Sequence, residues 1–247
     1  MYISPYEHLY NLATVIGCLT IADYTIELLL LAYVDKVINL RHTTWFFLHS
    51  LANVFICIFS VRSFINTLLY PDLCANGDIF TDQSAFGVSS VWPLTISNGI
   101  HLYHMYGGFT LSSADYFHHL LFIPTLSFPG QYYKWGSLSN SQAMFVTGLP
   151  GGIDYFLLGL VKIGAIQKNT EKRINVLLNT WLRVPGMLFT STILYQAFMT
   201  GNVKAPVWFV LIQLVLSPYN ALYFNKQAIE NYTKHKSAYS KCPSSKI

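Results

Sequence analysis

Seven long apolar runs constrain this chain more than any other feature of its sequence. They cover roughly residues 9–34, 43–70, 86–107, 114–133, 139–163, 176–200 and 205–224. About 20 apolar residues of α-helix cross the hydrocarbon core of a bilayer, and each run has about that length. Charged residues make up only 11% of the chain, against roughly 25% in a soluble domain. The sequence therefore predicts an all-α integral membrane protein, a bundle of about seven transmembrane helices with a range of five to seven.

Helix-breaking residues affect the prediction most in two of these runs. Run 114–133 contains Pro124 and Pro129, so we expect it to be kinked, short or re-entrant, which membranes tolerate where the broken backbone is buried in protein. Run 139–163 contains GLPGG at positions 148–152. This motif predicts close helix packing or a kink at Pro150.

Basic residues are distributed unevenly between the two sets of connections. With the N-terminus outside, one set holds Lys36, Arg41, Lys162, Lys168, Lys172, Arg173, Lys226, Lys234, Lys236, Lys241 and Lys246. The other set holds only Lys134 and Lys204. Because cytoplasmic loops are enriched in Lys and Arg, we predict a lumenal N-terminus and a cytosolic C-terminus.

Six charged side chains fall within or near the ends of the predicted spans: Asp23, Glu27, Arg62, Asp115, Asp154 and Arg183. Ionisable groups in a membrane are costly unless they are paired or hydrated, so these should face the bundle interior. Asp23 and Glu27 lie one turn apart, which favours a shared proton or contact with Arg62 or Arg183. Pairing between helices is our preferred interpretation of these charges, and contact with a substrate is the alternative.

Histidines gather at membrane depth. Five of the eight lie inside the apolar runs: His49, His101, His104, His118 and His119. Asp115 precedes the adjacent pair by three and four positions, so on a helix its carboxylate shares their face and could accept an imidazole N–H. One histidine of this group would then be a base or a nucleophile. The alternative is that the histidines only satisfy one another and the backbone, and for His49 we favour a role in helix packing.

The same histidines allow a metal site to be considered. His101 and His104 form an HxxH pair, and imidazoles bind zinc and iron. Membrane di-iron enzymes carry three histidine boxes with at least eight ligands, whereas this chain has five candidates and no such box. We therefore predict no metal.

Three segments carry a family resemblance. They are TTWFFLHSLAN at 43–53, HLYHMYGGFTLSSADYFHHLLF at 101–122 and LNTWLRVPG at 178–186. In order and spacing they resemble the TLC domain family, which includes ceramide synthases and translocating-chain-associated membrane proteins. The most specific part is Asp115 followed by His118 and His119. The resemblance divides the chain into an N-terminal helix and loop at 1–42, a TLC-like transmembrane domain at 43–224 and a basic cytosolic tail at 225–247.

The resemblance implies a helical bundle around an intramembrane cavity that is open to lipid. It also implies acyl transfer, in ceramide synthases from acyl-CoA to a sphingoid amine, with His118 or His119 as nucleophile or base and Asp115 as the orienting partner. By the same reasoning the substrate-binding residues are His49, His101, His104, Asp154 and Arg183. No bound cofactor is expected, and acyl-CoA would be a co-substrate. The chain departs from ceramide synthases at Ile123, where they have Thr, and near His104, where they have an acidic residue.

Two functions follow from this sequence. The first is a lipid-modifying enzyme of the endoplasmic reticulum, most concretely an acyl-CoA-dependent acyltransferase. The second is a noncatalytic protein that binds or senses lipid or regulates membrane composition, with the histidines lining a polar pocket. Membrane lipids are the expected partners and nucleic acid is not, while the oligomeric state stays open. A transporter ranks last because the chain lacks the paired broken helices of that class.

Overall fold

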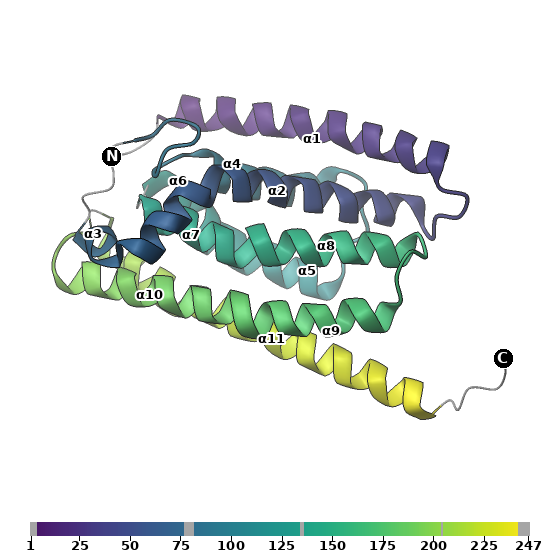
Figure 1. Cartoon of the computed structure of the whole chain (residues 1–247). Coiled ribbons are helices and arrows are strands. Elements are labelled where there is room, and N and C mark those ends of the chain that lie inside the picture. Colours follow the sequence, from purple (N-terminus) through teal and green to yellow (C-terminus); the bar gives the residue numbers. More distant parts are fainter. Residues whose placement is uncertain (1–3, 77–81, 134–135, 204, 242–247) are drawn as a thin grey trace.

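The computed structural model describes residues 4–76, 82–133, 136–203 and 205–241, and all regular elements within these ranges are helices. The helices run side by side along one long axis, and α11 ends at the opposite end of the bundle from the start of α1 (Figure 1). The elements are α1 (Pro5–Tyr33), α2 (Leu40–Leu69), α3 (Pro71–Asn76), α4 (Trp92–Tyr106), α5 (Ser113–Phe117), η1 (His118–Ser127), α6 (Phe128–Tyr133), α7 (Ser137–Ala143), η2 (Met144–Gly148), α8 (Leu149–Lys162), α9 (Lys168–Leu178), η3 (Asn179–Arg183), α10 (Val184–Met199) and α11 (Val207–Lys241).

Four helical segments of the described chain are long and apolar enough to cross a membrane. They are Pro5–Tyr33, Leu40–Leu69, Ser137–Lys162 and Val207–Ser237. Large apolar side chains on their outer faces are exposed, for example Leu28 and Leu31 on α1, as expected of surfaces that contact lipid. The chain is thus an all-α integral membrane protein. The seven-helix count stays a prediction, because runs 86–107, 114–133 and 176–200 are not among these four segments.

Three π-helical segments interrupt the bundle, and each is associated with a proline. Pro124 lies inside η1, while Pro150 and Pro185 follow η2 and η3 by two residues. Proline has no backbone N–H and its ring displaces the preceding carbonyl, so a wider turn relieves the clash. Run 114–133, predicted to be kinked, short or re-entrant, is a continuous rod of α5, η1 and α6 with a π-helical middle.

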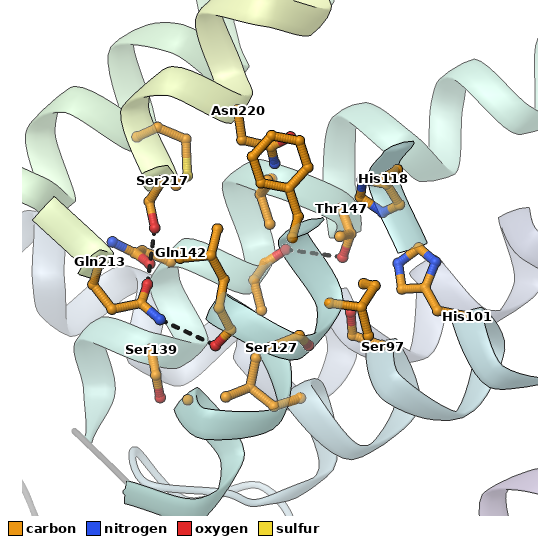
Figure 2. A pocket seen from close by; sticks show the side chains of 18 residues that line it. Ser97, His101, His118, Ser127, Ser139, Gln142, Thr147, Gln213, Ser217 and Asn220 are labelled. Carbon is orange, nitrogen blue, oxygen red and sulfur yellow. Dashed lines mark hydrogen bonds between the residues drawn. The ribbon is translucent and has the colours of Figure 1, made fainter. Parts of the chain in front are cut away.

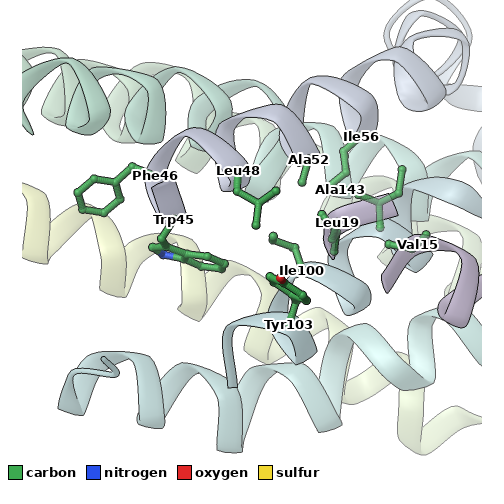
Figure 3. Close-up of a cluster of buried hydrophobic side chains, with 11 residues drawn as sticks. Val15, Leu19, Trp45, Phe46, Leu48, Ala52, Ile56, Ile100, Tyr103 and Ala143 are labelled. Atoms are coloured by element: carbon green, nitrogen blue, oxygen red, sulfur yellow. The ribbon is translucent and has the colours of Figure 1, made fainter. Parts of the chain in front are cut away.

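Helix α2 lies at the centre of the packing, and α8 approaches it closely through the GLPGG motif. A Cβ on Gly152 would lie 3.3 Å from the Cβ of Asn53. The hydroxyl of Ser50 donates to the carbonyl of Gly152 at 2.9 Å. The predicted close packing at this motif is confirmed. On the other side of α2, Leu48 packs with Ile100 and with residues of α1 in the main apolar cluster (Figure 3).

Helix α1 is fastened to the bundle by a group that we call the Asp23 clamp, made of Asp23, Arg41 and Tyr103. Asp23 is 2% exposed. Its Oδ1 accepts from Arg41 Nη1 at 2.8 Å and its Oδ2 accepts from the Tyr103 hydroxyl at 2.7 Å. Arg41 also donates to the carbonyl of Gly107 and lies 4.0 Å from the centre of the Phe109 ring. The preferred interpretation, a pairing between helices, is confirmed for Asp23.

The partners expected for the two acids of α1 were wrong. Asp23 and Glu27 meet Arg41, at 2.8 and 3.4 Å, and not Arg62 or Arg183. Arg41 sits in the first turn of α2, beside the end of α1, because the link between these helices is short. Arg62 instead pairs with Asp82 at 2.6 Å.

The predicted tail at 225–247 does not begin at a helix end. Helix α11 continues through residue 225 to Lys241, over a segment that contains four lysines, which favour helix. The remaining residues of the tail, 242–247, lie outside the described residues, as do Lys134 and Lys204.

Candidate functional site

One cavity collects every site residue that the sequence predicts. Its volume is about 290 Å³, and its lining includes His49, His101, His104, Asp115, His118, His119, Asp154 and Arg183. Its lining includes His42 in the first turn of α2 and Leu158 near the end of α8. It therefore lies toward the end of the bundle that carries the α1–α2 and α8–α9 links (Figure 1). At these links the backbone N–H of Ile38 donates to the carbonyl of Lys162 at 3.2 Å. We call it the histidine cavity. Its size is at the lower end of the range for small-molecule sites.

Five imidazoles form a connected group on the wall of this cavity. His104 Nδ1 and His119 Nε2 are 3.1 Å apart and hydrogen-bonded. The ring centres of His101 and His118 are 4.8 Å apart, and those of His49 and His101 are 5.8 Å apart. These rings come from α2, α4 and η1, so residues separated by up to 70 positions meet at one place. The Nδ1 atoms of His118 and His119 are buried and have no hydrogen-bond partner.

Aromatic rings hold two of the imidazoles in place. His104 stacks on Trp45 and His49 stacks on Tyr155, each with ring centres 3.8 Å apart and planes within 10°. Asn53 Nδ2 lies 3.0 Å from His49 Nδ1. Stacking of this kind orients a ring without using its nitrogen atoms, so it leaves those atoms free for hydrogen bonds.

Asp115 does not have the role that its spacing suggested. Its carboxylate Oδ2 accepts from the backbone N–H and the hydroxyl of Ser112, both at 2.7 Å, in a capping box at the start of α5. The third residue of a helix that follows a serine cap is the usual position for such an acid. The hydrogen-bond partner of His119 is therefore His104, and Asp115 lines the cavity without a hydrogen bond to an imidazole.

Asp154 and Arg183 add two ionisable side chains to the lining of the cavity. Asp154 Oδ1 and Arg183 Nε are buried and have no partner, whereas Arg183 Nη1 donates to Asn179 Oδ1 at 2.5 Å. Each π-helical segment supplies part of the lining: His118 and His119 from η1, Thr147 from η2 and Arg183 from η3. Wide turns of this kind are frequent at functional sites.

Sequence analysis missed several residues of the histidine cavity. Trp45 and Asn53 lie one turn before and one turn after His49, so the three side chains lie on one face of α2. His42 and Tyr155 also line the cavity. The four-residue spacing around His49 was the signal that would have found the α2 wall.

A second, smaller pocket adjoins the histidine cavity. Its volume is about 70 Å³. The two share His101, His118, Val146, Thr147 and Asn220. Figure 2 shows hydroxyl and amide side chains around this second pocket, with His101 and His118 at one side of it. We call it the amide pocket.

No group of three or more His, Cys, Asp or Glu side chains in the described part of the chain has the geometry to hold a metal ion. The chemistry that this arrangement offers is that of imidazoles with free ring nitrogens in an apolar surrounding, suited to nucleophilic attack or proton transfer.

Fold and site together define a class: a multi-helix membrane protein with a histidine-lined internal cavity. Comparison with protein-family models, with curated proteins and with solved structures found no match for this chain.

Proposed function

We propose that this protein is a lipid-processing membrane protein of the TLC type, which transfers an acyl group from acyl-CoA through His118. The proposal includes seven spans around the histidine cavity, an opening of that cavity to lipid, and residence in the endoplasmic reticulum with a lumenal N-terminus. The observation that carries it is the pair of adjoining cavities with His118 in their common wall. A reacting group in that position can meet one substrate from each side.

The two cavities differ in chemistry, as the two substrates of an acyl transfer do. The histidine cavity is lined by Asp115, Asp154 and Arg183 in addition to its imidazoles, whereas the amide pocket has uncharged amide, hydroxyl and apolar lining apart from the two shared histidines. An activated acyl group would enter the first, and the acceptor lipid would present its reacting group from the second.

His118 suits the nucleophile better than His119. The Nε2 of His119 is hydrogen-bonded to His104, and His119 does not line the amide pocket. The Nδ1 of His118, like that of His119, has no partner, so the two rings differ at Nε2 and in their access to the amide pocket. In the transfer, a ring nitrogen of neutral His118 attacks the thioester carbonyl, the C–S bond breaks, and the CoA thiolate leaves with the imidazole proton. The acceptor then attacks the acyl-imidazole, the C–N bond breaks, and the acceptor's proton returns to the ring.

Basic residues at the end of the bundle that contains the histidine cavity support an anionic co-substrate. Lys36 lies in the α1–α2 link, Lys162 ends α8 and Lys168 begins α9, all at the end of the bundle where the cavity lies. The phosphates of CoA are attracted to such a cluster. The same charge distribution supports placing this end in the cytosol.

The test is the intact mass of the purified chain after incubation with palmitoyl-CoA. We expect a palmitoyl adduct on wild type and on His119→Ala, and none on His118→Ala. His235→Ala, a histidine of the basic part of α11 outside both cavities, is the matched control and should carry the adduct. An adduct that persists in His118→Ala, or is missing from wild type, would contradict the assignment.

A noncatalytic lipid-binding protein is the second candidate. The observation that favours it is that Asp115 accepts hydrogen bonds from Ser112, so neither His118 nor His119 donates to this carboxylate and gains basicity from it. In that case wild type and His118→Ala would co-purify with the same lipid, and neither would form an acyl adduct.

A further inference from the structure

The amide pocket has a lining that is unusual for a place inside a membrane protein. Eight of its 18 lining side chains are serine, threonine, asparagine or glutamine, and none is Asp, Glu, Lys or Arg (Figure 2). They come from α4, η1, α7, η2 and α11. An acyl chain would pack against the apolar part of this wall, but it would leave the amide and hydroxyl groups beside it without hydrogen bonds.

Two amide side chains of this pocket each have a polar atom without a hydrogen-bond partner. Gln142 and Asn220 are 6% and 5% exposed, and the Nε2 of Gln142 and the Oδ1 of Asn220 have no hydrogen-bond partner. Gln213 in the same wall differs: its Nε2 donates to the carbonyl of Leu126 at 3.0 Å, and its Oε1 accepts from Ser217 at 2.8 Å. An unpaired buried polar atom costs about 1–3 kcal/mol. The wall of this pocket therefore contains one buried donor and one buried acceptor without a protein partner, beside an amide whose donor and acceptor are both satisfied.

We propose that the amide pocket binds the neutral hydroxyl group of a lipid alcohol, with the hydroxyl donating to Asn220 Oδ1 and a lipid oxygen accepting from Gln142 Nε2. The pocket has room for about five waters at 10–15 Å³ each, which suits a headgroup-sized fragment. A charged amine finds no carboxylate there. Because His118 lines the same pocket, the bound hydroxyl lies beside the residue assigned to carry the acyl group.

This inference rests on the proposed function for its meaning, since it names the acceptor of the transfer as a lipid alcohol rather than a sphingoid amine. The step that follows forms an ester: the hydroxyl oxygen attacks the carbonyl of the acyl-imidazole, the C–N bond breaks, and the hydroxyl proton passes to the imidazole. Binding of the alcohol needs no acyl-CoA, so it can be measured separately from the transfer.

The experiment compares three probes on the full-length chain in detergent without acyl-CoA: 1,2-dioctanoylglycerol, its 3-O-methyl ether and sphinganine. Dissociation constants are measured by native mass spectrometry. We expect wild type to bind the alcohol at least about tenfold more tightly than the ether, since one unmade buried hydrogen bond costs about that factor. Sphinganine should bind more weakly than the alcohol.

Variants then locate the effect. Asn220→Leu should reduce the preference for the alcohol to less than about threefold and leave binding of the ether unchanged, because only the alcohol donates to Asn220. Gln142→Leu should weaken binding of the alcohol and the ether alike, because both keep the oxygen that accepts from Gln142 Nε2. Gln196→Leu, the same substitution at an exposed position of α10, should keep the full preference. If either pocket variant does not fold, the affinities of wild type for the alcohol and the ether still test whether the chain recognises the hydroxyl group.

Equal affinity of wild type for the alcohol and the ether overturns the inference, and so does tighter binding of sphinganine. Neither result touches the proposed function, which depends on the adduct at His118. Conversely, a chain that prefers the alcohol but forms no adduct refutes the acyl transfer and leaves the hydroxyl site in place.

Discussion

The Asp23 clamp and the histidine cavity both bury ionisable side chains between membrane helices, and they treat them in opposite ways. In the clamp, both carboxylate oxygens of Asp23 are paired, one with Arg41 and one with Tyr103. In the cavity, His118, His119, Asp154 and Arg183 each keep a buried nitrogen or oxygen atom without a partner. The first region uses polar groups to hold helices together, and the second leaves polar atoms without a partner, as our proposal of a ligand site requires.

The membrane makes this difference informative. A buried polar atom with no partner is costly in any fold, and inside a bilayer ionisable groups are expensive unless they are paired or line a hydrated cavity. This fold pairs both carboxylate oxygens of Asp23, so unpaired polar atoms are not a general property of its buried ionisable groups. Substitutions should therefore affect stability in the clamp and binding in the cavity, and the following predictions test that division from the largest expected effect to the smallest.

Removing the carboxylate of the clamp should have the largest effect. Asp23→Ala leaves Arg41 and the Tyr103 hydroxyl without their shared partner, and breaking a buried ion pair from one side costs about 3–5 kcal/mol. We expect the lower end, about 3 kcal/mol, because the Arg41 side chain is 34% exposed. The measurement is Tm in detergent. Glu27→Ala is the matched control, with an effect below about 1 kcal/mol, since Glu27 is 35% exposed and 3.4 Å from Arg41. Equal Tm values for the two variants would contradict a stabilising role of the Asp23 clamp.

The packing contact between α1 and α4 should show the next largest loss of stability on substitution. A Cβ on Gly99 would lie 2.4 Å from Cγ1 of Val15, and valine is stiff at χ1 in a helix, so Gly99→Ala must push α1 away. Overpacking of this kind costs about 1–3 kcal/mol. Gly17→Ala on α1, where a Cβ meets nothing within 4 Å, should be neutral or slightly stabilising. A drop in Tm for Gly99→Ala no larger than for Gly17→Ala would contradict close packing at this contact.

Two histidines of the cavity form a matched pair for stability. His104→Leu removes the partner of His119 and the ring stacked on Trp45, so it should cost about 1–2 kcal/mol. His118→Leu removes a ring with an unpaired buried nitrogen, so Tm should stay the same or rise, while the acyl adduct is lost. A fall in Tm for His118→Leu as large as for His104→Leu would mean that His118 holds the fold rather than a ligand.

The comparison of the two regions also separates what the sequence could predict from what it could not. Hydropathy predicted the helical membrane fold, and the unusual gathering of histidines and charges at membrane depth predicted a list of site residues that the fold brings into one cavity. Both predictions rest on free energies that depend on the local sequence alone. A long apolar run is unfavourable in water, and a polar side chain is unfavourable in a membrane, whatever the rest of the fold.

Pairing partners were the part that sequence could not supply. Arg41 was counted among loop residues, yet the short link after α1 returns it to Asp23. Asp115 has the spacing of an imidazole partner, but its carboxylate instead accepts a hydrogen bond from Ser112, three residues before it. The amide pocket was missed because Gln142 and Asn220 stand far apart in the chain. A clue did exist in α11, where Gln213, Ser217 and Asn220 recur at helical spacing in an otherwise apolar run.

The smallest effect is expected at a surface ion pair, which marks the lower limit of what pairing contributes in this molecule. Asp82 lies in the connection between α3 and α4, where its carboxylate accepts from the hydroxyl and the backbone N–H of Ser84 at 2.6 and 3.1 Å. These bonds, together with the Arg62 guanidinium at 2.6 Å, lower the pKa of Asp82 below its usual value.

The direction of the pH dependence at Asp82 follows from that shift. A carboxyl whose pKa is lower in the folded state contributes stability above its unfolded pKa of about 3.9, and this contribution is lost as the pH falls through the lower folded value. Asp82→Asn should therefore lower Tm slightly at about pH 7 and by less at about pH 3, as measured by thermal unfolding of both proteins at each pH. Because Asp82 and Arg62 are solvated, the difference at about pH 7 must be far smaller than that of Asp23→Ala. If the two were comparable, burial would not be what separates the clamp from an ordinary ion pair.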